Sequence, residues 1–255
     1  MGLEQFSLAG KTALVTGSGR GIGKGIALCM AEAGADVINI GRNIERLEQT
    51  TAEVKARGRK SMYIQADVRE GEQVQAMFEK AVREFGKIDI LVNNVGTPTH
   101  WDNREITEKG WDAMMRENLK TTFLCTQAAA KIMKEKLTKG SIINISTREA
   151  ILPGSGTAYA AAKAGVNSLT QSWAALLAPD GIRVNCLMPG VTVHPVSIEY
   201  TNLNDPAVRA AEEKKTLLGR LGTPEDVGWA VVFLASEAGS YITGVCLSVD
   251  GGAAH

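Results

Sequence analysis

The sequence predicts one α/β domain built on a doubly wound parallel sheet of about seven strands, with helices on both faces. Short β-branched runs alternate with longer amphipathic stretches, which is typical of parallel strands joined by helices. The 255 residues include 44% hydrophobic and 22% charged side chains, an ordinary globular composition with ample material for a core. No linker, repeat or low-complexity tract divides the chain, so residues 1–255 are expected to form a single domain.

In chain order, each predicted strand is a short run of β-branched and apolar residues, and the connecting stretches have helical length. Strands are expected at Thr12–Thr16, Val37–Ile40, Ser61–Gln65, Ile88–Val92, Ser141–Ile145, Arg183–Leu187 and Cys246–Val249. Helices are expected at Gly21–Ala33, Ile44–Arg57, Gly71–Phe85, Thr107–Lys136, Tyr159–Leu177 and Pro224–Ala235. Glycine is favoured where a helix ends, and one stands between a helix and the next strand at Gly34, Gly58, Gly86, Gly140 and Gly181.

Charge and cysteine content exclude several classes of protein. The 28 basic residues balance the 28 acidic ones, so no nucleic-acid surface is expected. The cysteines Cys29, Cys125, Cys186 and Cys246 form no CxxC pair, so neither a metal site nor a redox dithiol is predicted. No secretory signal pattern opens the chain, and no apolar run has the roughly 18 residues of a membrane span. A cytoplasmic protein without membrane contact is expected.

A glycine-rich segment joins the first predicted strand to the first predicted helix. It reads Thr-Gly-Ser-Gly-Arg-Gly-Ile-Gly from Thr16 to Gly23. Glycines let the backbone approach a pyrophosphate closely, and the helix N-terminus supplies free N–H groups. The strand before and the helix after favour a cofactor loop over a plain turn. The candidate cofactor-binding residues here are Gly17, Ser18, Arg20, Gly21, Ile22 and Gly23.

The spacing of this loop is TGxxxGxG, and it resembles the cofactor loop of the short-chain dehydrogenase/reductase family. The resemblance covers essentially the whole chain. It implies a Rossmann fold, a nicotinamide cofactor, and a homotetramer assembled through two long helices, here 107–136 and 159–177. The family includes 3-oxoacyl-acyl-carrier-protein reductases and sugar, polyol and steroid dehydrogenases, which share one chemistry. The resemblance therefore names no substrate.

The end of the second strand indicates which nicotinamide cofactor is used. A carboxylate there binds the adenosine ribose and repels a 2′-phosphate, but this chain has Gly41 followed by Arg42 and Asn43. Arg42 and Arg20 form a pair that can clamp a phosphate, and in the resembling family such a pair implies NADP(H). Two solvated surface arginines, and hence an NAD(H)-dependent alcohol or polyol dehydrogenase, remain the alternative.

Further cofactor contacts are implied by the resemblance. Asp67 and Val68 match the family's adenine-contacting pair, although an aspartate there is also a helix cap. Asn94 and Gly96 belong to an Asn-Asn-Val-Gly segment that matches the family's NNAG. Three more candidate positions, Pro189, Gly190 and Thr192, follow the sixth strand. The family's threonine two residues later is His194 here, so either Thr192 or His194 takes over its contact.

The predicted chemistry lies in Tyr159 and Lys163, which are four residues apart and share one helix face. A nearby ammonium is expected to lower the pKa of the phenol from its ordinary value near ~10. Ser146 ends a strand thirteen positions before Tyr159 and is expected to face the same crevice. Serine, tyrosine and lysine at this spacing form the family's active site. Asn118 matches the family's fourth member, which bends a helix and holds a proton-relaying water.

The substrate pocket is expected after Ser146, along Thr97–Asn103 and in a substrate loop at about 191–218. Arg148 is a candidate ligand for an anionic substrate, or Glu149 neutralises it. Apolar walls are expected from Trp101, Met188, Tyr200 and Leu203.

The predicted function is an NADP(H)-dependent oxidoreductase that interconverts a carbonyl and a secondary alcohol, with Tyr159 as general acid and base. A nicotinamide-sensing protein without turnover is the alternative from another class, because fold alone does not fix function. The intact set of Asn118, Ser146, Tyr159 and Lys163 argues against it.

Overall fold

The computed structural model describes residues 3–97, 105–152 and 156–253. Within them, seven parallel strands form one sheet in the order β3-β2-β1-β4-β5-β6-β7. The strands are β1 (Thr12–Thr16), β2 (Asp36–Gly41), β3 (Ser61–Gln65), β4 (Ile90–Asn93), β5 (Ser141–Ile145), β6 (Arg183–Pro189) and β7 (Cys246–Val249). The strand order reverses between β1 and β4, and at such a switch point ligands bind beyond the carboxyl ends of the strands.

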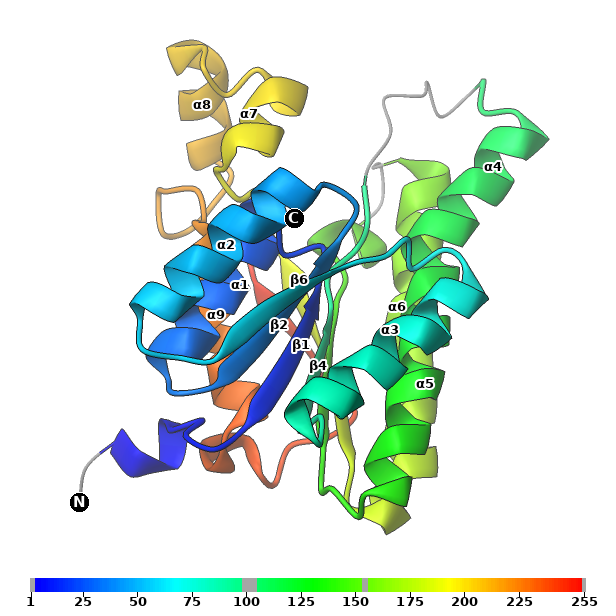
Figure 1. Cartoon of the computed structure of the whole chain (residues 1–255). Helices are drawn as coiled ribbons and strands as arrows, with labels where there is room; N and C mark the ends of the chain where they lie inside the picture. The colour runs from blue at the N-terminus through cyan, green and yellow to red at the C-terminus, as the bar shows by residue number, and fades with distance from the viewer. Residues whose placement is uncertain (1–2, 98–104, 153–155, 254–255) are drawn as a thin grey trace.

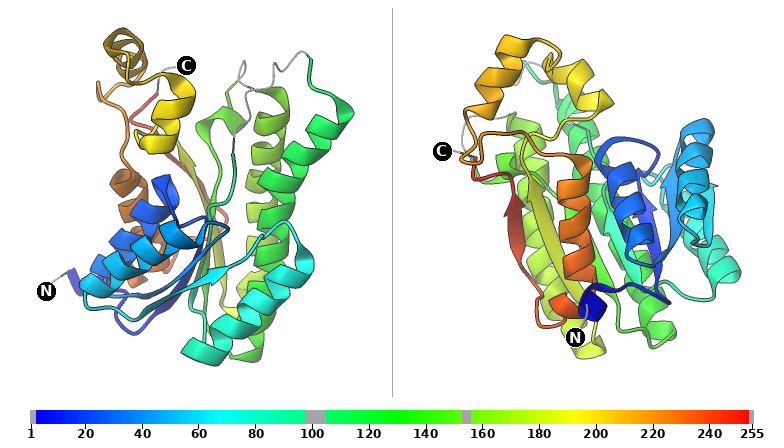
Figure 2. Two further views of the ribbon diagram at one scale, coloured as in Figure 1. Left: turned by 45° about the horizontal axis from the view of Figure 1, so that its top comes forward. Right: turned by 90° about the vertical axis from the view of Figure 1, so that its left-hand side faces the viewer.

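Helices cover the sheet on both faces (Figures 1 and 2), which confirms the predicted fold class. On one side lie α1 (Gly21–Glu32), α2 (Ile44–Ala56) and α9 (Pro224–Ala235). On the other lie α3 (Gly71–Phe85), α4 (Glu108–Met115), α5 (Thr121–Glu135) and α6 (Thr157–Leu177). Two short helices, α7 (Pro195–Thr201) and α8 (Pro206–Glu213), stand beyond the carboxyl end of the sheet.

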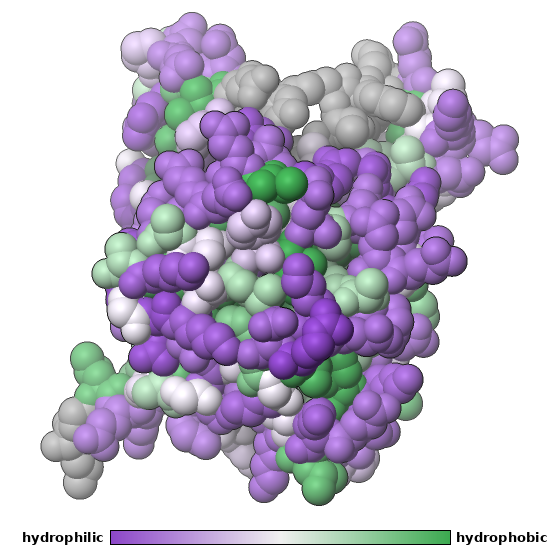
Figure 3. All heavy atoms as spheres, viewed as in Figure 1, coloured by the Kyte–Doolittle hydropathy of each residue, from purple (hydrophilic) through white to green (hydrophobic). Residues whose placement is uncertain are grey.

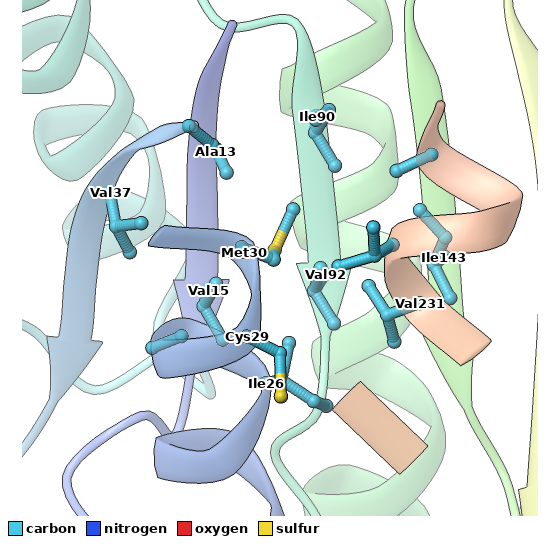
Figure 4. Close-up of a cluster of buried hydrophobic side chains, with 14 of the residues drawn as sticks. Ala13, Val15, Ile26, Cys29, Met30, Val37, Ile90, Val92, Ile143 and Val231 are labelled. Atoms are coloured by element: carbon cyan, nitrogen blue, oxygen red, sulfur yellow. The ribbon is translucent and has the colours of Figure 1, made fainter. Parts of the chain in front are cut away.

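The core consists of two apolar layers, one on each face of the sheet. In the layer shown in Figure 4, Val15 and Val92 on neighbouring strands meet Ile26 of α1 and Val231 of α9. All four side chains are buried. Strands buried on both faces explain the continuous apolar runs in the sequence.

Besides small shifts in the ends of several elements, the structure departs from the helix predicted over 107–136 and from the role expected of Gly140. The single helix expected over 107–136 is interrupted by a π-helical turn at Arg116–Lys120, which separates α4 from α5. Gly140 does not end a helix in a left-handed conformation, because Leu137 takes that role with φ 52°. Glycine is required at residue 140 by close packing, because a Cβ there would lie 2.3 Å from the sulfur of Met133.

The segment following β6 carries more structure than the sequence analysis assigned to it. Both α7 and α8 begin with a proline at the first helical position, preceded by a capping side chain, His194 and Asp205 respectively. The capping residues and the prolines are visible in the sequence. Helices of seven and eight residues, however, are too short for a helical pattern of apolar residues to be recognised.

The surface on the side shown in Figure 3 is largely hydrophilic. Among the described residues, no helix is both long and apolar enough to span a membrane.

Candidate active site

A cavity of about 510 Å³ opens at the carboxyl ends of the strands. Its lining comes from segments that follow six strands, β1 to β6, and from α7. Sequence-predicted residues that line it are Gly17, Arg20, Gly21, Ile22, Gly23, Arg42, Asn43, Asp67, Val68, Asn94, Gly96, Ser146, Arg148, Tyr159, Lys163, Pro189, Gly190 and Thr192. Two predicted residues, Ser18 and Asn118, are buried and do not line it. Topology thus brings together residues that lie far apart in the sequence.

The glycine loop, residues 17–23, forms one wall of the cavity. Gly17 and Gly21 adopt left-handed conformations with φ of 67° and 57°. A Cβ on Gly23 would lie 2.3 Å from the carbonyl oxygen of Gly17 and 2.4 Å from Nδ2 of Asn94. Asn94 holds the loop against β4 by donating from Nδ2 to the carbonyl oxygen of Thr16 at 3.1 Å. The loop therefore has the close backbone packing that a pyrophosphate requires at a helix N-terminus.

Three arginines gather where the glycine loop meets the end of β2. Arg20, Arg42 and Arg46 all line the cavity. Within the described part of the chain, no carboxylate lies within ion-pair distance of any of them. Gly41 occupies the position where an acidic residue would repel a phosphate. Arg46 was not among the predicted cofactor-binding residues. It lies in the first turn of α2, where Asn43 caps the helix by accepting a hydrogen bond from the backbone N–H of Arg46 at 2.9 Å.

Asp67 and Val68 lie at the end of β3 and line the cavity as predicted. Asp67 is held by Arg69, whose Nε donates to it at 2.9 Å. Arg69 also forms an ion pair with Glu117 at 2.7 Å. Hydrogen bonding from Arg69 keeps the pKa of Asp67 below its ordinary value, so the carboxylate stays charged at the cavity wall. No local pattern indicates the pair of Arg69 and Glu117, since only the fold brings the segment after β3 beside the π-helical turn.

Ser146, Tyr159 and Lys163, which we name the tyrosine cluster, also line the cavity. Ser146 ends β5 and is buried, and its Oγ donates to the carbonyl oxygen of Lys163 at 3.0 Å. Lys163 is buried as well, and its Nζ donates to the carbonyl oxygen of Ile145 at 2.9 Å and lies 5.9 Å from the centroid of the Tyr159 ring. Strand and helix thus present the three side chains to one space.

Burial dominates the protonation of this cluster. It raises the pKa of Tyr159, with the negative charge of Glu149 as a second cause. Burial also lowers the pKa of Lys163 to about 8. The expectation that Lys163 lowers the tyrosine pKa is therefore wrong for the protein alone, because desolvation penalises the phenolate and weakens the ammonium. At neutral pH Tyr159 carries its proton.

Asn118 lies in the π-helical turn between α4 and α5, which is the bend that the resemblance implied. Its Oδ1 accepts a hydrogen bond from the N–H of Thr97 at 2.9 Å, and its Nδ2 donates to the carbonyl oxygen of Met114 at 3.2 Å. A Cβ on Gly96 would lie 2.8 Å from this Oδ1 and 2.6 Å from Nζ of Lys163. Asn118 and Lys163 thus meet beside Gly96.

The two candidates left open after β6 both line the cavity and are held by different contacts. Thr192 is buried, and its Oγ1 donates to the carbonyl oxygen of Gly190 at 3.1 Å. His194 caps α7 by accepting the N–H of Ser197 on Nδ1 at 3.2 Å. Its ring also lies against the glycine loop, where a Cβ on Gly21 would be 3.1 Å from Nδ1. His194 therefore fastens the segment after β6 to the loop.

Arg148 and Glu149 both line the cavity next to the tyrosine cluster. Burial raises the pKa of Glu149, and the charge of Arg148 opposes this more weakly. Within the described residues the two side chains form no ion pair, so Arg148 is not neutralised by direct contact. Of the predicted apolar walls, Met188 and Leu203 are buried and do not line the cavity, so that prediction is wrong for both. Trp101 and the side chain of Tyr200 lie outside the described residues.

Known proteins match the chain over nearly its full length. A family model described as enoyl-(acyl carrier protein) reductase matches residues 17–254. The chain belongs to the short-chain dehydrogenase/reductase family. Members of this family are oxidoreductases that use a nicotinamide cofactor. The family named from the glycine loop is therefore confirmed.

Relatives with different substrates are about equally similar. The chain is 39% identical over 257 residues to 2-dehydro-3-deoxy-D-gluconate 5-dehydrogenase of Escherichia coli, covering 98% of each protein. It is 39% identical over 244 residues to a 3-oxoacyl-acyl-carrier-protein reductase of Staphylococcus aureus, covering 95% of this chain and 97% of the relative. A structure from Agrobacterium tumefaciens, assigned to a 2-deoxy-D-gluconate 3-dehydrogenase with bound NADP, has a TM-score of 0.88 at 36% identity and covers 97% of this chain and 98% of its own.

Proposed function

We propose that the chain is an NADP(H)-dependent oxidoreductase that interconverts a carbonyl group and a secondary alcohol, with Tyr159 as general acid and base. One observation carries the proposal: the tyrosine cluster and the three arginines line the same cavity. A nucleotide phosphate on the arginine side and a substrate oxygen on the tyrosine side then belong to one continuous site. When bound, the nicotinamide supplies or accepts the hydride at the substrate carbon.

Tyr159 acts as the proton donor in the reductive direction. Its raised pKa keeps the phenol protonated at neutral pH, which is the form that donates to a carbonyl oxygen. Lys163, with a pKa of about 8, exchanges protons with solvent in the working range and supplies the proton that Tyr159 loses. The family's relay water would lie near Asn118 and Gly96, because Nζ of Lys163 lies beside both residues.

Ser146 positions the substrate oxygen. Its hydroxyl is buried at the end of β5 and donates to a backbone carbonyl of α6. A hydroxyl rotates freely about its C–O bond, so the same proton can be aimed at a substrate oxygen instead. Together with Tyr159 it provides two donors for a developing alkoxide, which is the arrangement that stabilises such a charge.

The preference for NADP(H) rests on Arg20, Arg42 and Arg46. Charge-assisted hydrogen bonds to a 2′-phosphate contribute about 1.5–3 kcal/mol each, so Arg42→Ala should weaken NADPH binding by roughly 10- to 100-fold and leave NADH binding nearly unchanged. Arg57→Ala, at the exposed end of α2, is the matched control and should alter neither. Binding is read from nicotinamide fluorescence. Equal losses for both cofactors would contradict the phosphate clamp and favour an NAD(H) enzyme.

We further propose a substrate that carries a carboxylate, recognised by Arg148. The residue lies beside the tyrosine cluster without a carboxylate partner among the described residues, and a similar protein from Escherichia coli is named for a sugar acid. Arg148→Ala should raise the KM of anionic substrates and spare neutral ones, whereas Glu149→Gln should not discriminate between them. Equal losses on both kinds of substrate would remove the idea.

The experiment that tests the whole proposal is a panel of sugar acids, neutral sugars, ketones and alcohols, followed by nicotinamide absorbance with both cofactors. Turnover of any member with NADP(H) supports it. Tight NADPH binding without turnover on any member would favour the nicotinamide-sensing alternative.

We also propose a homotetramer assembled through α4, α5 and α6. Phe123 of α5 and Trp173 of α6 pack with ring centroids 6.3 Å apart, and Leu176 nearby is 66% exposed. Such apolar side chains on long helices fit a subunit interface. Light scattering after size exclusion measures the state directly, and a monomer would contradict it.

A further inference from the structure

Two cysteines that are sixty residues apart in the sequence lie side by side in the sheet. Cys186 of β6 and Cys246 of β7 are Cα partners in the parallel register. Neighbouring strands lie about 4.7–4.9 Å apart, and disulfides span Cα separations of about 4.4–6.8 Å. No sequence motif indicates this pair, because the two cysteines form no CxxC motif and only the pairing of β6 with β7 brings them together.

Both thiols point to the face of the sheet that α6 covers. The sulfur of Cys186 donates to Oδ1 of Asn167 at 3.5 Å, and the sulfur of Cys246 donates to the backbone carbonyl oxygen of the same residue at 3.9 Å. Cys186 is fully buried, packed with Val166 and Met188, while Cys246 is half-buried at the edge strand. One thiol is therefore sheltered and the other is within reach of small solutes.

The two thiols differ in acidity. The neighbouring Cys186 thiol lowers the pKa of Cys246. The same interaction, together with burial, raises the pKa of Cys186. The remaining two cysteines are different, since burial raises the pKa of Cys29 and of Cys125 to about 12 each. Because the thiolate is the reactive form, Cys246 is the favoured nucleophile and Cys186 its resolving partner.

We propose that Cys186 and Cys246 form a redox-active thiol pair that hydroperoxides convert into a disulfide behind the tyrosine cluster. The Cys246 thiolate attacks one peroxide oxygen, the O–O bond breaks, and a sulfenic acid forms as water or an alcohol leaves. The Cys186 thiol then attacks the sulfenic sulfur, forming the S–S bond and releasing water. The two sulfurs lose two electrons in total, and the hydroperoxide gains them.

The pair is coupled to the candidate active site through α6. Asn167 lies one helical turn after Lys163, and its Nδ2 lies 3.4 Å from the sulfur of Met188, which precedes Pro189 in the cavity wall. Disulfide formation removes the thiol proton that Asn167 Oδ1 accepts. We expect it to lower turnover reversibly, and this second consequence rests on the proposed function.

The disulfide is tested without reference to activity. The reduced protein is treated with hydrogen peroxide, and free thiols, intact mass and proteolytic peptides are measured. We expect two of the four thiols to disappear, a mass lower by two hydrogen atoms, and a peptide linked between Cys186 and Cys246, all reversed by dithiothreitol. A Cys246→Ala variant should keep its three thiols under the same treatment. Loss of Cys29 or Cys125 instead, a bond between two chains, or unchanged thiols would overturn the proposal.

The coupling is tested by turnover of the oxidised protein. The wild type should lose activity on oxidation and regain it with dithiothreitol, whereas Cys246→Ala should be insensitive to peroxide. A linked peptide with unchanged turnover would refute the coupling and leave the disulfide standing. Absence of any turnover before oxidation would count against the proposed function instead, since the mass and thiol measurements do not depend on it.

Discussion

The glycine loop and the tyrosine cluster line the same cavity, but the first is built from backbone and the second from side chains. The loop is made of backbone: its shape depends on left-handed glycines and on the absence of side chains at Gly17 and Gly23. The cluster is made of buried side chains whose hydroxyl, phenol and ammonium groups are tuned by desolvation. Substitutions in the loop should therefore weaken cofactor binding through steric crowding, while substitutions in the cluster should lower turnover in an intact fold.

The sharpest test of this difference is Tyr159→Phe, which removes one oxygen atom and keeps the ring. General acid–base catalysis contributes about 10²–10⁴-fold, so we expect turnover to fall by that factor while NADPH affinity and the melting temperature stay near the wild-type values. Steady-state kinetics and fluorescence titration measure both. Turnover within about tenfold of the wild type would contradict the role of Tyr159 as general acid and base.

The requirement for close backbone packing in the glycine loop is tested by Gly23→Ala. The new Cβ would lie 2.3 Å from the carbonyl oxygen of Gly17, so the loop has to move. Overpacking of this kind costs about 1–3 kcal/mol, and we expect a lower melting temperature together with NADPH affinity reduced by roughly tenfold or more. Gly71→Ala is the control, because a Cβ there meets no atom within 4 Å. Unchanged NADPH affinity in Gly23→Ala would show that the loop does not set binding.

The pH dependence of stability distinguishes the two regions again, because only the cluster contains a buried amine. Burial lowers the pKa of Lys163 from the ordinary 10.5 to about 8. Between these values the unfolded chain binds more protons than the folded one, so this group makes the protein more stable as pH rises from 8 to 10 and loses that contribution as pH falls through 8. We expect the unfolding free energy of the wild type, relative to Lys163→Met, to rise by on the order of 1 kcal/mol per pH unit. A flat difference in denaturant titrations would mean that Lys163 is solvated.

The smallest effect is expected where the segment after β6 touches the glycine loop. His194→Ala removes the N-cap of α7, and a lost cap costs about 1 kcal/mol. We expect hydrogen exchange of the α7 amides to quicken by roughly fivefold with little change in global stability. His194→Asn keeps a capping oxygen and should restore slow exchange. Equal exchange in His194→Ala and the wild type would show that α7 is held by packing alone.

The alternation of strands and helices, the glycine loop and the tyrosine cluster could all be predicted from the sequence. These are local properties: β-branched runs, the strand–glycine–helix order, and an i, i+4 spacing each need only neighbouring residues. Four of the seven strands and the helices Gly71–Phe85 and Pro224–Ala235 have the predicted bounds.

Contacts between residues far apart in the sequence depend on the tertiary structure and could not be predicted. The fold brought Arg46 into the cavity wall, joined Arg69 to Glu117, and paired Cys186 with Cys246. It also reversed the expected effect on the pKa of Tyr159, because burial is a property of the folded protein and no spacing in the sequence reports how much solvent a side chain loses.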